Sequence, residues 1–159
     1  MLSENEVNPK YWPLMCKYLA LCIYFCKKLI SYDLVFSIAR LYGKIMHLRK
    51  LPKEAIEVYL MLRDISYDAK SSKMKVESYR LLGRIYQLEK EHHKAIICYK
   101  KMLAEAWVNE DHGLEQEAYT GLSKQYYYFG QITKCKMYFD RSSYGIFEGD
   151  GSQPKQVAV

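Results

Sequence analysis

The sequence lacks the motifs that mark most catalytic centres. Its 8 glycines form no phosphate-binding loop, it contains no H-E-x-x-H zinc motif, and no serine or cysteine lies in a nucleophile motif. The adjacent His92 and His93 fall at the start of an expected helix, where a neutral surface role is the ordinary expectation. We therefore predict that the protein is not an enzyme, with no catalytic residues, no cofactor and no small-molecule substrate.

The sequence also lacks the paired cysteines of a zinc site. Among its 5 cysteines, Cys16, Cys22 and Cys26 fall within one apolar segment, whereas Cys98 and Cys135 fall in two other expected helices. No pair has the C-x-x-C spacing, and a metal site using Cys22 and Cys26 on one helix face is the weaker alternative. We predict no metal, and the odd number of thiols indicates a reducing compartment rather than a disulfide framework.

No apolar run is long enough to cross a bilayer. The apolar segment 18–26 is bracketed by lysines and is much shorter than the roughly 20 residues that a transmembrane helix needs. Glu4 and Glu6 precede it, where a signal peptide would carry positive charge. We interpret the segment as a buried helix and predict no membrane partner.

A pattern that recurs every 40 residues is what the sequence does contain. Leu82-Gly83, Tyr86, Ala95 and Tyr99 have equivalents forty positions earlier and forty positions later. Three copies in register predict a repeat array, in which each unit buries its face against its neighbours. The structural repeat positions are Gly43, Ala55, Tyr59, Leu82, Gly83, Tyr86, Ala95, Tyr99, Leu122, Tyr126, Cys135 and Phe139.

Each copy has the hydrophobic spacing of two helices. Tyr79, Leu82, Gly83 and Tyr86 follow the i, i+3, i+4, i+7 spacing of one helical face, and a second stripe begins at Ala95. We expect the small residues to let two helix backbones approach and the tyrosines to fill the space beside that contact. Ser123 and Cys135 keep the small size in the third copy.

These residues resemble the tetratricopeptide repeat, whose signature is a large residue, Leu-Gly and Tyr in the first helix and Ala and Phe in the second. The resemblance covers residues 36–143, but Tyr79 and Tyr119 replace the usual tryptophan, and the closing proline is missing. The period is 40 instead of 34, which implies longer helices. Similar long-period repeats occur in spindle-orientation adaptors and ciliary proteins, and segment 111–116 is similar to their junction between repeats. The resemblance implies an all-α, right-handed α-solenoid of stacked antiparallel helix pairs.

Helix signals give the expected boundaries of about seven helices. Pro13 and Pro52 suit helix starts, Asp33, Ser71 or Ser72 and Asp111 suit N-caps, and Gly130 suits a helix end. The Gly-rich end of the chain predicts a flexible tail, unless Ile146 and Phe147 fold back over the last repeat. The expected divisions are an N-terminal extension 1–12, a repeat domain 13–143 consisting of a partial repeat 13–32 and repeats 33–70, 71–110 and 111–143, and a C-terminal tail 144–159.

The first helices of such repeats line a concave surface, and here that surface is predicted to be basic. Lys44, Arg84 and Lys124 occupy equivalent places, and the formal net charge of +6 favours acidic partners. The alternative is a solvated helix face on which Glu77 and Glu117 pair with the cations. The predicted partner-binding groove comprises Arg40, Lys44, His47, Arg80, Arg84, Gln87, Lys124 and Tyr127.

The function that the resemblance implies is a protein-interaction scaffold or adaptor that binds an acidic peptide or helix within a larger assembly. It implies a cytoplasmic location, with cytoskeletal or ciliary assemblies as candidates. The alternative is an RNA-binding helical repeat protein, since such repeats can read one base each. A modest charge excess and the lack of a recurring base-reading pair make nucleic acid the second choice.

Overall fold

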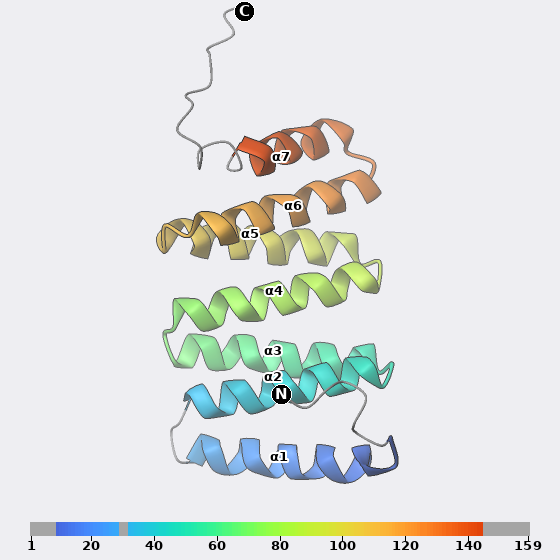
Figure 1. Cartoon of the computed structure of the whole chain (residues 1–159), viewed down its shortest axis with the longest axis vertical. Coiled ribbons are helices and arrows are strands. Elements are labelled where there is room, and N and C mark those ends of the chain that lie inside the picture. The colour runs from blue at the N-terminus through green and yellow to red at the C-terminus, as the bar shows by residue number, and fades with distance from the viewer. Residues whose placement is uncertain (1–8, 29–31, 145–159) are drawn as a thin grey trace, which may run out of the picture. The chain divides into compact units, whose positions relative to one another are not determined.

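The structure is a computed structural model that describes residues 9–28 and 32–144 (Figure 1). Within these residues the chain forms one short 3-10 helix and seven α-helices, with no strand. The fold is therefore all-α, as predicted. The elements are η1 Pro9–Tyr11, α1 Trp12–Lys28, α2 Tyr32–Leu48, α3 Pro52–Asp68, α4 Ser72–Leu88, α5 His92–Val108, α6 His112–Tyr128 and α7 Ile132–Tyr144.

The regularity of the chain is finer than the 40-residue pattern. Helices α1 to α6 have 17 residues each. From α2 to α7, every turn that joins one helix to the next has the same backbone conformation. In each connection the residue before last has a positive φ, and the next N–H bonds back to the carbonyl oxygen five residues earlier, as Leu51 N does to Met46 O. This is the Schellman ending of a helix. The positive-φ residues are Lys50, Lys70, Lys90, Glu110 and Gly130.

The helix ends agree closely with the signals in the sequence, with one correction. Asp111 accepts a hydrogen bond from Leu114 N at 3.0 Å, and Ser71 Oγ accepts one from Met74 N at 3.4 Å, so both act as N-caps. Asp33 does not cap α2, because the helix already begins at Tyr32. Its carboxylate lies in the first turn, where negative charge favours the helix dipole.

The predicted divisions can be compared with the helices. Repeats 33–70, 71–110 and 111–143 hold the pairs α2–α3, α4–α5 and α6–α7, and α1 falls in the predicted partial repeat. Tyr144 is the last residue of α7, not the first of the tail. Residues 145–159, with the expected flexibility and the folding back of Ile146 and Phe147, lie outside the described residues, as do 1–8 and 29–31.

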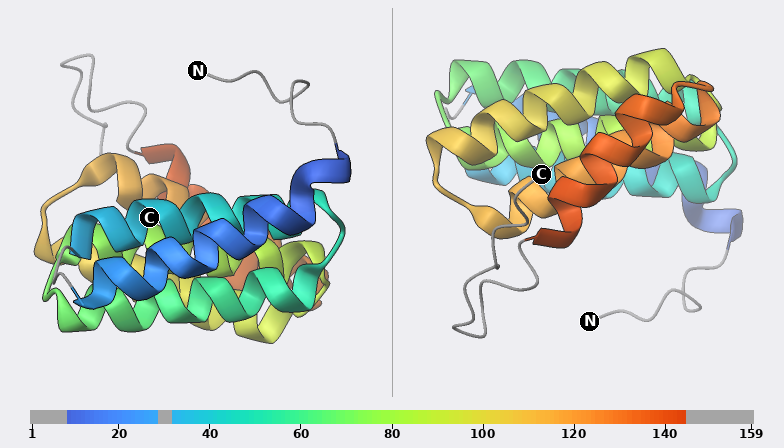
Figure 2. Two further views of the ribbon diagram at one scale, coloured as in Figure 1. Left: turned by 90° about the horizontal axis from the view of Figure 1, so that it is seen from below. Right: turned by 90° about the horizontal axis from the view of Figure 1, so that it is seen from above.

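The chain divides into two compact units between Met74 and Lys75, inside the first turn of α4. In the first unit α2 packs against both α1 and α3. In the second unit α6 packs against both α5 and α7, and the right-hand view of Figure 2 shows α7 crossing α6. Both units are thus built from consecutive helices packed side by side.

Each repeat glycine provides space for a tyrosine ring. A Cβ built on Gly83 would lie 3.0 Å from Tyr99 Cε1, and one built on Gly43 would overlap the ring of Tyr59. The prediction that tyrosines fill the space beside the small residues is therefore confirmed at these glycines, because a ring from the second helix of the same repeat lies against each of them. Gly121 on α6 contacts the other side of Tyr99, with 2.7 Å between its built Cβ and Cε1.

The third repeat departs from this packing. Ser123 stands at the glycine position and has a Cβ where the ring would lie, and the equivalent ring, Phe139, is 60% exposed. The expectation that Phe139 packs like Tyr59 and Tyr99 is wrong for this reason, and also because no described helix follows α7 to cover it. Ser123 Oγ instead lies 3.6 Å from Cys135 Sγ.

Candidate functional site

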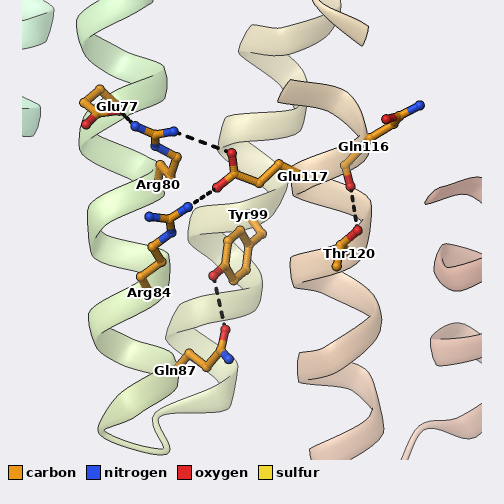
Figure 3. A network of polar contacts seen from close by, with 8 residues as sticks. All are labelled: Glu77, Arg80, Arg84, Gln87, Tyr99, Gln116, Glu117 and Thr120. Atoms are coloured by element: carbon orange, nitrogen blue, oxygen red, sulfur yellow. Dashed lines mark hydrogen bonds and ion pairs between the residues drawn. The ribbon is translucent and has the colours of Figure 1, made fainter. Parts of the chain in front are cut away.

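Two arginines of α4 converge on one glutamate of α6 (Figure 3). Arg84 Nη2 donates to Glu117 Oε1 at 2.7 Å, and Arg80 Nη1 lies 3.6 Å from Glu117 Oε2. Arg80 also pairs with Glu77 one turn earlier on its own helix. Glu117 thereby links the first helices of two successive repeats, and we call these four residues the Arg–Glu network.

The Arg–Glu network is formally neutral and only partly buried. The pairing with Glu77 and Glu117, considered above as the alternative to a free basic surface, is present. The Arg84 side chain remains 57% exposed, compared with 30% for Arg80. The Arg80 Nε atom is buried and has no hydrogen-bond partner. An arginine guanidinium has five N–H donors and can donate two parallel hydrogen bonds to one carboxylate, so Arg84 can contact a second acidic group without leaving Glu117.

Tyr99 of α5 lies next to the Arg–Glu network (Figure 3). Its hydroxyl donates to Gln87 Oε1 at 3.2 Å (Figure 3). Its ring lies against both Gly83 of α4 and Gly121 of α6. Burial raises the pKa of Tyr99 to about 12; Arg84 opposes the rise and Glu117 adds to it. The hydroxyl therefore stays protonated near neutral pH and holds Gln87 beside α5.

We expect Tyr99 to make the stability of the protein fall at alkaline pH. The pKa of Tyr99 in the fold is about 12, against the 10.0 that is ordinary for a tyrosine, so its contribution to stability is complete below pH 10 and is lost as pH rises toward 12. Because one pKa unit corresponds to about 1.4 kcal/mol, the loss reaches about 2 kcal/mol near pH 11.5. Urea denaturation of wild type and Tyr99→Phe at about pH 9 and about pH 11.5 measures it.

The phenylalanine variant is the matched control, since burial also raises the pKa of Tyr42 and Tyr119 and these contributions remain in both proteins. Equal losses of stability in wild type and Tyr99→Phe would contradict the assignment to Tyr99.

The other predicted groove residues also lie on the first helices of their repeats. Arg40, Lys44 and His47 are exposed on α2 in the first unit. Lys124 and Tyr127 are exposed on α6 in the second unit, with Lys124 two turns after Glu117. The structure thus brings together Arg80, Arg84 and Gln87, and a continuous ladder through all three repeats stays a prediction.

The junction between α5 and α6 carries its own polar contacts. Trp107 Nε1 donates to Glu115 Oε1 at 2.9 Å, and this bond is the main cause of the lowered pKa of the Glu115 carboxyl, with burial opposing it. His112 Nδ1 lies 3.4 Å from Glu115 Oε2. These contacts lie in the segment whose likeness to long-period repeats was noted above, and they fix the entry to α6.

A second polar cluster lies at the start of α5. Gln125 is completely buried, and its Oε1 lies 3.0 Å from His92 Nδ1, while the His92 ring stacks on Tyr128 at 5.3 Å between centroids. His92 is therefore half-buried, and the expectation of a surface role is wrong for it, whereas His93 is exposed. The sequence analysis missed this cluster. Gln125 stands where the other two copies have isoleucine, so the repeat pattern predicts a buried position there, but it does not indicate that His92 is the hydrogen-bond partner.

Two findings on absent features concern the described part of the chain alone. Nowhere in it do three His, Cys, Asp or Glu residues gather as a metal site would require. None of its helices has both the length and the hydropathy needed to cross a bilayer.

No protein-family model and no curated protein matches the sequence. Solved structures do match the fold. BtubC (BKLC) from P. vanneervenii matches with a TM-score of 0.74 and 16% identity over 94% of this chain and 63% of that one. The TPR domain of Arabidopsis FLU matches with a TM-score of 0.68 and 18% identity, over 76% of this chain and 100% of that one. A putative kinesin light chain of Podosopora anserina with nearly identical TPR-like repeats matches with a TM-score of 0.69 and 14% identity, over 90% of this chain and 72% of that one.

These likenesses establish the fold class. The chain has the fold of tetratricopeptide-like helical repeats, so the resemblance found in the sequence is confirmed at the level of the fold. This chain spans 63% of the length of BtubC. Repeat folds of this kind typically present extended surfaces to other proteins.

Proposed function

We propose that the protein is a non-enzymatic scaffold that binds an acidic peptide or helix of a larger assembly along the first helices of its repeats. The single observation that supports this is the Arg–Glu network, in which Arg84 holds one carboxylate and keeps more than half of its surface open. Arg84 and Lys124 are the principal cations in this proposal, and Tyr127 adds an exposed aromatic surface on α6.

Glu117 has a specific part in the proposed binding. Its carboxylate occupies the arginine forks of α4 much as a carboxylate of the partner would, and it holds both guanidinium groups in place. An acidic segment then either shares Arg84 with Glu117 or displaces Glu117 from it. The proposed location is cytoplasmic, in a cytoskeletal or ciliary assembly; a cytoskeletal one is also in keeping with the likeness to a putative kinesin light chain.

We expect Glu117→Gln to strengthen the binding of acidic peptides. The substitution keeps the shape of the side chain but removes the charge that competes for Arg84, so affinity should rise by about three- to tenfold, or roughly 1 kcal/mol. Fluorescence anisotropy with a labelled Glu/Ala helical peptide measures it, and a Lys/Ala peptide of the same length is the control.

Two outcomes would contradict this proposal. Weaker binding of the acidic peptide to Glu117→Gln would show that Glu117 does not compete with it. Tighter, salt-sensitive binding of a single-stranded RNA than of either peptide would favour the RNA-binding alternative.

A further inference from the structure

Helix α1 exposes a broad apolar surface opposite the side that holds buried Cys16. The exposed apolar side chains, which we call the α1 face, are those of Leu14, Tyr18, Leu21, Cys22, Tyr24 and Phe25. At 3.6 residues per turn they cover an arc of about 160°, much wider than the seam between two contacting helices. The prediction that segment 18–26 is a buried helix is therefore wrong for this side of α1.

Half of the α1 face occupies positions that the array leaves in solvent elsewhere. Leu14, Leu21 and Tyr24 are 52%, 44% and 55% exposed. At the equivalent places α3 or α5 exposes a charged residue, namely Glu54, Asp64, Lys94 or Lys101. A neighbouring repeat helix therefore does not cover these positions. Their apolar character in α1 needs an explanation outside the packing of the array.

The other half occupies positions that the array buries. Tyr18, Cys22 and Phe25 are exposed, whereas their equivalents in α3 are 8%, 0% and 3% exposed; these are Val58, Leu62 and Ile65. One more helix of the array would cover this half alone. An occupant that covers both halves has to be broad and apolar, as the interfacial region of a lipid bilayer is.

The charges around the α1 face are all positive. Helix α1 contains no aspartate or glutamate, and Lys17 is exposed at the edge of the face beside Tyr24. The 3-10 helix before α1 adds exposed Lys10 and Tyr11. A lysine stem can lie along apolar surface while its ammonium group reaches a phosphate, and tyrosine is enriched at the boundary between membrane and water. A second copy of α1 would instead bring lysines against lysines.

We propose that the α1 face binds the surface of an anionic lipid bilayer. Helix α1 would lie in the membrane plane, with Leu14, Leu21 and Phe25 at the acyl boundary and Lys10 and Lys17 at the headgroup phosphates. The sequence prediction of no membrane partner was drawn from the length needed to span a bilayer, which a helix lying in the interface does not need. The proposal does not rest on the Arg–Glu network.

Sedimentation of the full chain with lipid vesicles tests this proposal. The vesicles consist of phosphatidylcholine alone or of phosphatidylcholine mixed with phosphatidylserine. We expect at least about tenfold tighter binding to the vesicles that contain phosphatidylserine, because each lysine near an anionic surface strengthens binding. Lys17→Glu should remove most of that preference.

A double substitution on the α1 face separates apolar contact from charge. Leu14→Glu with Tyr24→Asp gives α1 the residues that α3 exposes at the equivalent positions, so the fold should be kept. We expect this variant to bind phosphatidylserine vesicles at least about tenfold more weakly. Leu88→Glu with Ile97→Asp is the matched control, since it removes two exposed apolar side chains from α4 and α5 with the same change of charge. It should bind like wild type.

Four outcomes would overturn the proposal. They are no binding to either kind of vesicle, equal losses in the two double variants, loss of vesicle binding in Arg84→Glu but not in the α1 variant, and self-association that depends on Leu14. The third would assign lipid binding to the predicted groove, and the fourth would assign the α1 face to a second copy. Circular dichroism of both double variants confirms that they are folded.

Discussion

Replacing Gly121 by alanine should destabilise the protein by about 1–3 kcal/mol, the range typical of overpacking. In most helices this change would stabilise by up to about 1 kcal/mol. Here the added Cβ would lie 2.7 Å from two ring carbons of Tyr99. The ring cannot move away easily, because Gly83 contacts its other side and its hydroxyl bonds to Gln87. Urea denaturation followed by circular dichroism measures the change.

Gly113→Ala is the matched control in the same helix. A Cβ on Gly113 meets only Asp111 Oδ1 at 3.4 Å, an ordinary contact, so this variant should be as stable as wild type or more so. Tyr99→Leu should make Gly121→Ala less harmful, so the double variant should lose less than the sum of the two single losses. A Gly121→Ala protein that is as stable as Gly113→Ala would show that Tyr99 is not confined between α4 and α6.

Reversing the charge of Arg84 should reduce the binding of an acidic helical peptide at least tenfold, or about 1.4 kcal/mol. Glutamate at this position would face Glu117 and would repel the carboxylates that Arg84 is proposed to attract. Stability should change by only about 1 kcal/mol or less, because Arg84 is largely exposed and exposed ion pairs contribute little. Anisotropy titration with the Glu/Ala peptide measures binding, and thermal unfolding measures stability.

Lys101→Glu provides the control for net charge, since Lys101 is exposed on α5 and the substitution changes the formal charge equally. Adding Arg80→Glu should remove the remaining binding. If Lys101→Glu weakens binding as much as Arg84→Glu, the peptide responds to the overall charge of the protein, and the Arg–Glu network is not its site.

Local patterns in the sequence determined much of the fold. The helical spacing around Leu82 and Ala95, the cap at Asp111 and the recurrence of Gly43 and Gly83 predicted helix pairs in register. These signals are readable because helix periodicity and capping depend on residues within a few positions of one another. The positive-φ positions were missed, because three lysines and one glutamate occupy them and only Gly130 carries the usual signal.

The tertiary structure alone decided which side chains meet. Arg84 and Glu117 are 33 residues apart, and the repeat placed both on first helices without showing that they bond. The contact between Tyr99 and Gly121 joins two successive repeats, and Gly121 is not one of the recurring positions, so the repeat pattern did not predict it. Phe139 has the right residue type at the right place, yet it is exposed, because a ring packs only where the facing helix leaves room for it. Such contacts depend on how side chains of separate helices fill a shared space, and periodicity along one helix does not encode that.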